Sequence, residues 1–474
     1  MIFFPKPAIV VATLVFFLIG CTNSKKLPVT QDIKLSPQDN ALFDKVQKQT
    51  FQYFWEGAEP NSGMARERYH VDGEYPDNDQ NTVTIGGSGF GIMALLTGMN
   101  RGFISRSQGR ERLEKIVQFL DTADRFHGAW PHWLNGETGK VRPFGRRDDG
   151  GDLVETSFLL QGLLCARQFF NKGDSTEKVL AAHIDTLWHG VDFTWYRHGE
   201  NVLYWHWSPN YQWQMNFPVK GYNECLIMYI LAVASPSHGV PPEVYHAGWA
   251  QNGSIVSNGS VAGYRLQLYH QGDLPYGGPL FWAHYSFLGL DPRGLQDRYA
   301  DYWMENRNLT LINYDWCVKN PKYYRGYGPD NWGLTASYSI VGYAAHAPGR
   351  ETDLGVISPT AALSSFPYTP QQSMQALRHW YEDMGDKLWG PYGFYDAFSQ
   401  TANWFPKRYL AIDQGPEVVM MENYRSGLLW NLFMSCPEVK NALRTLGFSS
   451  PHLLIKEKKD KKATPEEKIT DTVN

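Results

Sequence analysis

Six segments of the sequence are apolar on nearly every side and rich in small residues, and they constrain the fold more than any other feature. A helix that is apolar all around must be buried on every side, and small residues let such helices pack closely. The six are residues 86–98 (GGSGFGIMALLTG), 156–170 (TSFLLQGLLCARQFF), 223–235 (NECLIMYILAVAS), 277–289 (GGPLFWAHYSFLG), 356–368 (VISPTAALSSFPY) and 424–434 (YRSGLLWNLFM).

Amphipathic segments alternate with these buried ones. In residues 105–124, Leu113, Ile116, Val117 and Leu120 follow the i, i+3, i+4, i+7 spacing of one helix face, with charges on the other. Residues 369–386 repeat the pattern with Met374, Leu377, Tyr381 and Met384. The first and last such helices are expected at residues 38–57 and 437–447.

Buried helices paired with amphipathic ones predict two concentric rings. The expected fold is all-α: an (α/α)6 toroid of inner and outer helices, with long irregular loops at one mouth. Its span of residues 37–450 exceeds the usual domain size, but a toroid spreads its core around a ring. Strand-like segments such as residues 81–85 (NTVTI) are short and scattered, which disfavours an α/β organisation.

The two ends of the chain are expected to lie outside this domain. Residues 1–20 carry Lys6 and an apolar run too short for a comfortable membrane-spanning helix, which is typical of a secretory signal. The run ends in Leu-Ile-Gly-Cys, which resembles a bacterial lipobox and predicts lipidation at Cys21. The alternative is an ordinary cleaved signal with an incidental cysteine. Residues 21–36 then form a flexible tether, and the lysine-rich residues 451–474 a disordered tail.

These features predict an exported lipoprotein held to the membrane by its lipid anchor. Lys25 and Lys26, with no aspartate directly after Cys21, favour the outer membrane of a Gram-negative host.

The formal net charge is −4 and no basic stripe is present, so nucleic acid is excluded as a partner. Nothing implies an obligate protein partner. The remaining cysteines form no CxxC pair and are expected to be buried free thiols: Cys165, Cys225, Cys317 and Cys436.

Aromatic residues make up 15% of the chain, and many occur in polar, Gly/Pro-rich segments. Such rings stack on the apolar faces of sugars while polar neighbours bond the hydroxyls, so they predict a carbohydrate-binding cleft. For any single residue, packing beneath a long loop is an equally good explanation. The candidate substrate-binding residues are Trp130, His132, Trp205, His206, Trp207, Tyr211, Asn223 and Trp332.

Other catalytic patterns are weak or missing. Residues 83–94 (VTIGGSGFGIMA) contain G-x-G-x-x-A, but an amphipathic helix follows where a dinucleotide-binding unit needs a second strand. Close packing of an inner helix explains these glycines better. HExxH, G-x-S-x-G and Walker motifs are not found, and the histidine spacings make no convincing zinc site. No metal or cofactor is expected, and the candidates for chemistry are carboxylates.

Acids recur where successive inner helices begin. Asp152 and Glu155 precede one buried run, Glu224 opens the next, and Asp413 lies just before the last. Asp152 and Glu155 alone match the D-x-x-E order of a helix capping box. Capping does not, however, predict the aromatic and amide residues around each acid. A ring of inner helices would gather these carboxylates at one mouth, which is the arrangement that glycosidic bond cleavage requires.

Local sequence gives each acid an expected role. Glu224 has the more apolar neighbours, Tyr222 and Leu226, and is the candidate proton donor. Asp152, Glu155 and Asp413 lie in more polar contexts and are expected to activate or position water; the first two share a helix face and are able to tune each other's pKa.

Long motifs along residues 40–447 resemble glycoside hydrolase family 144, the bacterial glucoamylase-like group that contains β-1,2-glucanases. They include TVTIGGSGFGIMAL, DRFHGAWPHW, GGDLVETSFLLQGLL, GYNECLIMYILA and LAIDQGPEVVMMENYRSGLLW. The resemblance implies an (α/α)6 fold, hydrolysis of β-1,2-glucan with inversion, and no required metal. It places functional acids at Asp152, Glu155 and Glu224, with Asp413 as an additional match.

Two alternatives remain open at this point. One is a hydrolase of another glucan linkage, and the other is a lipoprotein that binds glycan without cleaving it.

The mode of cleavage is also open. Exo release of sophorose needs one end of the cleft blocked, whereas endo action needs both ends open. Residues 236–278 and 306–331 are long enough to form a wall that blocks one end.

Overall fold

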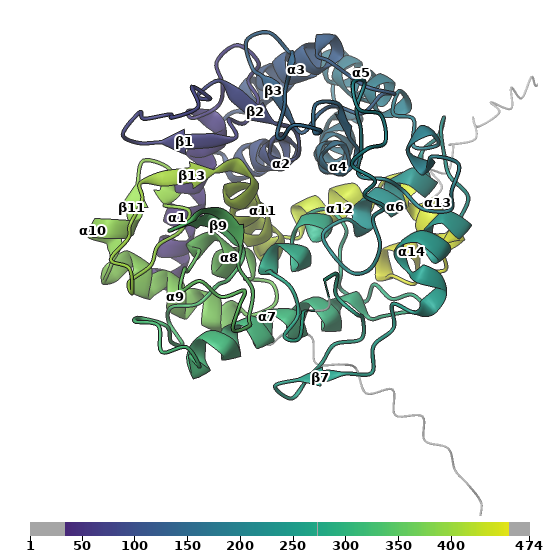
Figure 1. Cartoon of the computed structure of the whole chain (residues 1–474). Helices are drawn as coiled ribbons and strands as arrows, with labels where there is room; N and C mark the ends of the chain where they lie inside the picture. The colour runs from purple at the N-terminus through teal and green to yellow at the C-terminus, as the bar shows by residue number, and fades with distance from the viewer. Residues whose placement is uncertain (1–33, 273, 455–474) are drawn as a thin grey trace, which may run out of the picture.

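The computed structural model describes residues 34–272 and 274–454, and its helices form a closed double ring (Figure 1). The segments of the inner ring follow one another around its centre: α2 (Ile85–Arg101), α4 (Leu153–Phe170), α6 (Leu226–Ala234), η4 (Leu280–Ala283) with η5 (Tyr285–Phe287), α8 (Pro359–Ser364) and α11 (Ala411–Arg425). The all-α toroid predicted from the alternating helices is confirmed.

The outer ring covers the inner one. It consists of α1 (Pro37–Trp55), α3 (Arg106–Thr122), α5 (Ser175–His189), α7 (Tyr302–Lys319), α9 (Pro370–Glu382) and α13 (Pro437–Thr445), with the π-helical turn η2 (Tyr245–Trp249) beside α6. The further short helices are η1 (Trp195–Arg197), η3 (Gln251–Gly253), α10 (Gly385–Leu388), α14 (Pro451–Leu454) and α12 (Leu428–Phe433), the last of which packs against the inner helices α4 and α11.

The described strands are short and antiparallel, and they form five two-stranded sheets and one three-stranded sheet. They are β1 (Arg68–His70) with β13 (Arg408–Leu410), β2 (Thr82–Thr84) with β3 (Trp133–Asn135) and β4 (Val141–Arg142), β5 (Gly151–Asp152) with β6 (His206–Trp207), β7 (Ser260–Val261) with β8 (Tyr264–Arg265), β9 (Ala336–Ser339) with β10 (Gly342–Ala345), and β11 (Trp389–Gly390) with β12 (Gly393–Phe394). Strands β2, β5 and β13 each run directly into an inner helix, which fixes where α2, α4 and α11 begin.

Glycines let α2 and α4 pack against each other very closely. A Cβ at Gly89 would lie 2.2 Å from the Phe158 carbonyl oxygen, and one at Gly162 would lie 2.2 Å from the carbonyl oxygen of Gly89. Because β2 pairs antiparallel with β3, the glycine cluster of α2 is not part of a dinucleotide-binding unit. The packing explanation of these glycines is confirmed.

Two of the predicted inner segments differ in the structure. The sixth inner helix is α11, and the predicted segment 424–434 instead gives the short α12. Glu417, Glu422 and Asn423 make the sequence of α11 look too polar for an inner helix, yet all three side chains are buried. The fourth inner segment, residues 277–289, forms the two 3-10 turns η4 and η5 in place of an α-helix.

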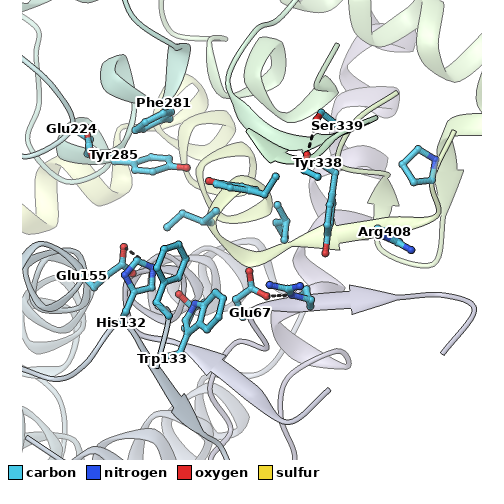
Figure 2. Close-up of a pocket in the computed structure, with 18 of the residues that line it drawn as sticks. Glu67, His132, Trp133, Glu155, Glu224, Phe281, Tyr285, Tyr338, Ser339 and Arg408 are labelled. Atoms are coloured by element: carbon cyan, nitrogen blue, oxygen red, sulfur yellow. Dashed lines mark hydrogen bonds and ion pairs between the residues drawn. The ribbon is translucent and has the colours of Figure 1, made fainter. Parts of the chain in front are cut away.

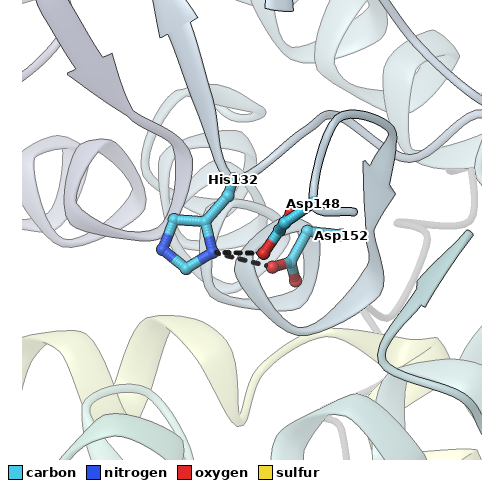
Figure 3. A group of neighbouring side chains, drawn as sticks. All are labelled: His132, Asp148 and Asp152. Atoms are coloured by element: carbon cyan, nitrogen blue, oxygen red, sulfur yellow. Dashed lines mark hydrogen bonds and ion pairs between the residues drawn. The ribbon is translucent and has the colours of Figure 1, made fainter. Parts of the chain in front are cut away.

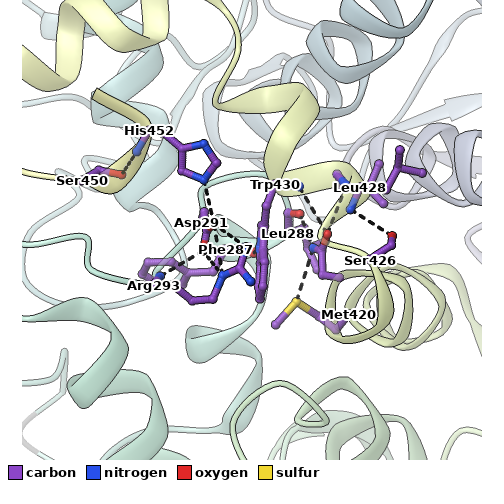
Figure 4. A network of polar contacts seen from close by, with 12 residues as sticks. Phe287, Leu288, Asp291, Arg293, Met420, Ser426, Leu428, Trp430, Ser450 and His452 are labelled. Carbon is purple, nitrogen blue, oxygen red and sulfur yellow. Dashed lines mark hydrogen bonds and ion pairs between the residues drawn. The ribbon is translucent and has the colours of Figure 1, made fainter. Parts of the chain in front are cut away.

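The C-terminal end of the described chain is fastened to the ring (Figure 4). In α14, His452 Nε2 lies 2.8 Å from Asp291 Oδ2, and the same oxygen is 2.8 Å from a guanidinium nitrogen of Arg293. The Arg293 guanidinium stacks on Trp430 at 4.4 Å. Residues 451–454 therefore belong to the folded domain, so the predicted tail starts too early; residues 455–474 lie outside the described chain.

The predicted signal, lipidation at Cys21 and most of the tether also lie outside the described residues. Within residues 34–272 and 274–454, no helix combines the length and apolar character needed to cross a bilayer. The four cysteines in this part of the chain are buried and free, as predicted.

Candidate active site

A cavity of about 1090 Å³ opens where the inner segments α2, α4 and α11 begin. That volume slightly exceeds the roughly 300–1,000 Å³ of typical small-molecule pockets. Its carboxylates are Glu67, Asp72, Asp148, Glu155 and Glu224. Its aromatic residues are Trp133, Phe144, Phe158, Trp205, Phe217, Phe281, Tyr285, Tyr338, Tyr343, Trp404 and Phe405. Figure 2 shows Glu155 and Glu224 at one side of the cavity, near Tyr285, and Arg408 at the opposite side.

Asp152 both caps α4 and holds two side chains of the site. Its Oδ1 accepts a hydrogen bond of 2.9 Å from the Glu155 backbone N–H, the bond expected of an N-cap. Its Oδ2 accepts from Trp205 Nε1 and from His132 Nδ1, each at 2.9 Å. Since its side chain is fully buried and both oxygens already accept bonds, Asp152 positions its neighbours.

Glu155 does not complete a capping box. Its Oε2 accepts a 2.8 Å hydrogen bond from the backbone N–H of Gly86 on α2, and its Oε1 lies 4.0 Å from His132 Nε2 at the cavity wall. Burial raises the pKa of Glu155, the His132 charge opposes the rise, and the Asp152 charge adds to it. Capping therefore explains Asp152 in part, but it does not explain the position of Glu155.

His132 lies among three carboxylates. Its Nδ1 is 2.9 Å from Asp152 Oδ2 and 3.9 Å from Asp148 Oδ2 (Figure 3). Burial alone would lower its pKa, but Glu155, Asp152 and Asp148 together raise the pKa of His132 to about 10. An imidazolium at this point partly neutralises the acids that surround it.

Glu224 lies just before α6, where the Ser286 hydroxyl donates to its backbone carbonyl oxygen. Its side chain lines the cavity although only 9% of the residue is exposed. Burial raises the pKa of Glu224 to about 7, and the charges of Glu155 and Asp152 add to the rise while a hydrogen bond with Trp282 opposes it. This environment favours the protonated form of Glu224, which is the form that a proton donor requires.

Asp413 is in the first turn of α11 and does not line the cavity. It is almost fully buried, and burial together with the adjacent, hydrogen-bonded Asp396 raises its pKa. Asp396 Oδ2 accepts a 2.9 Å hydrogen bond from the backbone N–H of Tyr338. Asp413 is also hydrogen-bonded to Tyr285, a residue of the cavity wall.

The predicted binding residues divide into two groups. His132 and Trp205 line the cavity. Of the others, Trp130 and Trp332 are fully buried in the core, and His206 and Asn223 are buried nearby with bonds to Gly150 and Gln271. Trp207 and Tyr211 are half-buried outside the cavity lining, Trp207 packing edge-on against His127. Direct sugar contact from Trp130 and Trp332 does not fit these positions.

Sequence reasoning missed several cavity residues. The sequence shows Asp148 only as part of a charged loop, although its place four residues before Asp152 is the signal that could have singled it out. The hairpin β9–β10 contributes Tyr338 and Tyr343, and residues 403–408 contribute Trp404 through Arg408. No described residue of segments 236–278 or 306–331 lines the cavity, so neither segment forms the wall considered above.

Known proteins share this sequence and this fold. A sequence model described as "Putative glucoamylase" matches residues 216–437, which include Glu224 and Asp413. An endo-β-1,2-glucanase from Chitinophaga pinensis, solved with sophorotriose and glucose, is 70% identical with a TM-score of 0.87; the match covers 88% of this chain and all of that one. The chain belongs to the glucoamylase-like family.

Two further relatives bear on the family and the fold. An exo β-1,2-glucooligosaccharide sophorohydrolase of Parabacteroides distasonis is 46% identical over 424 residues, or 86% of this chain. The chain spans 58% of the length of that relative. An endo-β-1,2-glucanase from Talaromyces funiculosus shares 13% identity with a TM-score of 0.62, covering 86% of this chain and 88% of its own, and supports the toroidal fold alone.

Proposed function

We propose that this protein is a glycoside hydrolase of family 144 that cleaves β-1,2-glucan. The observation that carries the proposal is one cavity, walled by aromatic rings, that holds three acids whose pKa values are raised by burial: Glu224, Glu155 and Asp148. The charge of His132 opposes the rise at Glu155 and Asp148, so Glu224 is the acid best suited to keep its proton. Glycosidic hydrolysis needs one protonated and one ionised carboxyl group. The names of the Chitinophaga and Parabacteroides relatives support β-1,2-glucan as the substrate.

Glu224 is the proton donor in this proposal. Its protonated oxygen delivers the proton to the glycosidic oxygen as the bond to the anomeric carbon breaks. The negative charges of Glu155 and Asp152 favour the protonated form before reaction.

Of the four other acids that line the cavity, Glu155 and Asp148 lie beside His132, and the water-activating group is one of these two. Glu155 Oε1 and Asp148 Oδ2 accept no hydrogen bond from the described residues, so each is free to accept one from water, whereas Asp148 Oδ1 is buried. Asp152 keeps His132 and Trp205 in place. Water attack on the face opposite the leaving group would invert the anomeric carbon.

We further propose endo action and export as a lipoprotein. The volume of the cavity supports binding of several glucose units, and the relative with 70% identity over its whole length is named an endo enzyme.

Export and outer-membrane anchoring rest on the signal-like residues 1–20 and on Cys21. Palmitate labelling in cells checks the anchor, and Cys21→Ala should abolish the label.

The decisive experiment incubates the protein with linear β-1,2-, β-1,3-, β-1,4- and α-1,4-glucans and resolves the products by size. Endo action on β-1,2-glucan yields a range of oligosaccharides, whereas release of sophorose alone would contradict it. Cleavage of a different linkage, or binding without cleavage, would overturn the proposed substrate or the enzyme assignment. NMR of the first products reports inversion or retention directly.

A further inference from the structure

His132, Asp148 and Asp152 place one nitrogen and two carboxylate oxygens within 4.8 Å of one another, directly beside the cavity (Figure 3). From this geometry we propose that the three residues form a binding site for a divalent transition metal such as Zn²⁺. Such an ion would be an inhibitor and not a cofactor. Only this inhibitory effect rests on the proposed function; the binding itself does not.

The ligand types fit this class of metal. Imidazole nitrogen with carboxylate oxygen suits Zn²⁺, whereas Mg²⁺ and Ca²⁺ prefer oxygen donors alone. Zinc bonds of about 2.0–2.2 Å set tetrahedral ligands roughly 3.3 Å apart. His132 Nδ1 is 2.9 Å from Asp152 Oδ2 and 3.9 Å from Asp148 Oδ2, so small side-chain rotations would bring the three to that spacing.

A second observation comes from Asp148, whose carboxylate has no hydrogen-bond donor among the described residues. The residue is 8% exposed, and its Oδ1 is buried without a partner. The carboxylate points at His132 in Figure 3, and its Oδ1 lies 3.3 Å from His206 Nε2, which already accepts the Gly150 backbone N–H. A buried carboxylate without a donor is costly unless a cation compensates it. The His132 imidazolium does so in the metal-free protein, and a bound metal ion would take over that role.

The surroundings provide the support that metal ligands need. Trp205 Nε1 donates a 2.9 Å hydrogen bond to Asp152 Oδ2 and so orients that ligand from the side. His132 and Asp148 both line the cavity, which leaves the remaining coordination position to water or a sugar hydroxyl. Because the metal takes the Nδ1 lone pair, the imidazole gives its Nδ1 proton to solvent on binding.

Binding would stop hydrolysis for a structural reason. The metal would replace the hydrogen bond between His132 and Asp152 and occupy Asp148, so the acid cluster would lose a water-activating group. Hydrolysis should therefore fall in proportion to metal occupancy and return when a chelator is added.

The test is calorimetric titration of the chelator-treated full-length protein with ZnCl₂ in the absence of glucan. We expect one Zn²⁺ per chain, with affinity reduced at least about tenfold in His132→Gln and in Asp148→Asn. His183→Gln is the matched control, because His183 lies on the outer helix α5, 3.6 Å from Asp121, and should leave binding unchanged. Thermal melting of each variant checks that it is folded.

Two results would overturn the proposal: no saturable binding to the folded protein, or binding that both site variants retain. A Trp205→Phe variant, which keeps every ligand, should bind Zn²⁺ more weakly than wild type but more tightly than Asp148→Asn. If the protein binds zinc but cleaves no β-1,2-glucan, the metal site stands and the proposed function fails. If glucan is cleaved with no effect of bound zinc, the inhibitory part is wrong.

Discussion

At the scale of single residues, the role of each acid in the site depends on whether its oxygens already accept hydrogen bonds from the protein. Asp152 is committed to three N–H donors, while Asp148, Glu155 and Glu224 line the cavity. Acids with similar sequence contexts therefore have different roles, and these roles follow from their hydrogen-bond partners.

Glu224→Gln should remove most hydrolysis while leaving the fold intact, because the amide keeps the shape of the side chain but has no acidic proton. Loss of a general acid costs about 10²–10⁴-fold in kcat. In the wild type, kcat/KM should fall as pH rises through about 7, since Glu224 then loses its proton. Near-normal activity in the variant would show that another group protonates the leaving oxygen.

Glu155→Gln and Asp152→Asn should separate catalysis from capping. In Glu155→Gln the new amide oxygen can still accept from Gly86, so the melting temperature should change little while activity is lost. In Asp152→Asn the new side chain has a single oxygen for three donors, so this variant should lose activity and also about 1–3 kcal/mol of stability. Equal stability losses in both variants would contradict this division; chemical denaturation measures them.

At the scale of elements, the sequence predicted where helices form better than it predicted which ring each helix belongs to or which residues line the cavity. The 3.6-residue apolar spacing located α3 and α9 because one face of each meets the inner ring. It misplaced the sixth inner helix, because buried polar residues of α11 take hydrogen-bond partners from distant segments, as Glu417 does from the Thr50 hydroxyl. A single-sequence pattern carries no information about such partners.

The same lack of information about distant partners explains why several predicted binding residues lie outside the cavity. Trp130 and His132 are two positions apart in one polar segment, yet Trp130 donates into the core at Leu120 while His132 faces the acids. Composition indicated a sugar cleft but not which ring would face it. The walls from β9–β10 and residues 403–408 depend on how short strands fold back over the mouth, which the local sequence does not specify.

Gly89→Ala should destabilise the contact between α2 and α4. The new methyl group would meet backbone atoms of Phe158 and Leu159, which have no room to move without separating the helices. We expect a loss of about 1–3 kcal/mol or more in the free energy of unfolding. Gly145→Ala is the control, since a Cβ there meets nothing within 4 Å. Equal stability of the two variants would show that the helices are not in such close contact.

At the scale of the whole molecule, the ring buries many carboxyl groups whose pKa values are raised. For Glu417, which accepts a 2.8 Å hydrogen bond from the Thr50 hydroxyl, burial raises the pKa from 4.5 to about 8. Below the pKa that Glu417 has in the unfolded chain, both the folded and the unfolded state hold the proton, and the contribution of Glu417 to stability is fully present. As pH rises toward 8 the unfolded chain releases that proton first, and stability falls.

The protein should therefore be less stable at pH 8 than at pH 5, and Glu417→Gln should reduce the difference. Each pKa unit corresponds to about 1.4 kcal/mol. Urea unfolding at both pH values measures the effect, with the exposed Glu111→Gln as the control. A pH dependence identical to wild type in Glu417→Gln would show that Glu417 does not contribute.

The contact between α1 and α11 has a consequence for how the molecule is made. Thr50 and Gln47 bond to Glu417 and Val418, so the first outer helix, which also packs against α2, meets α11 only near the end of the chain. A ribosome or an export channel delivers the chain from its N-terminus, so the toroid stays open until almost all of it has emerged. Until then the surfaces of α1 and α2 that α11 covers in the folded ring stay exposed.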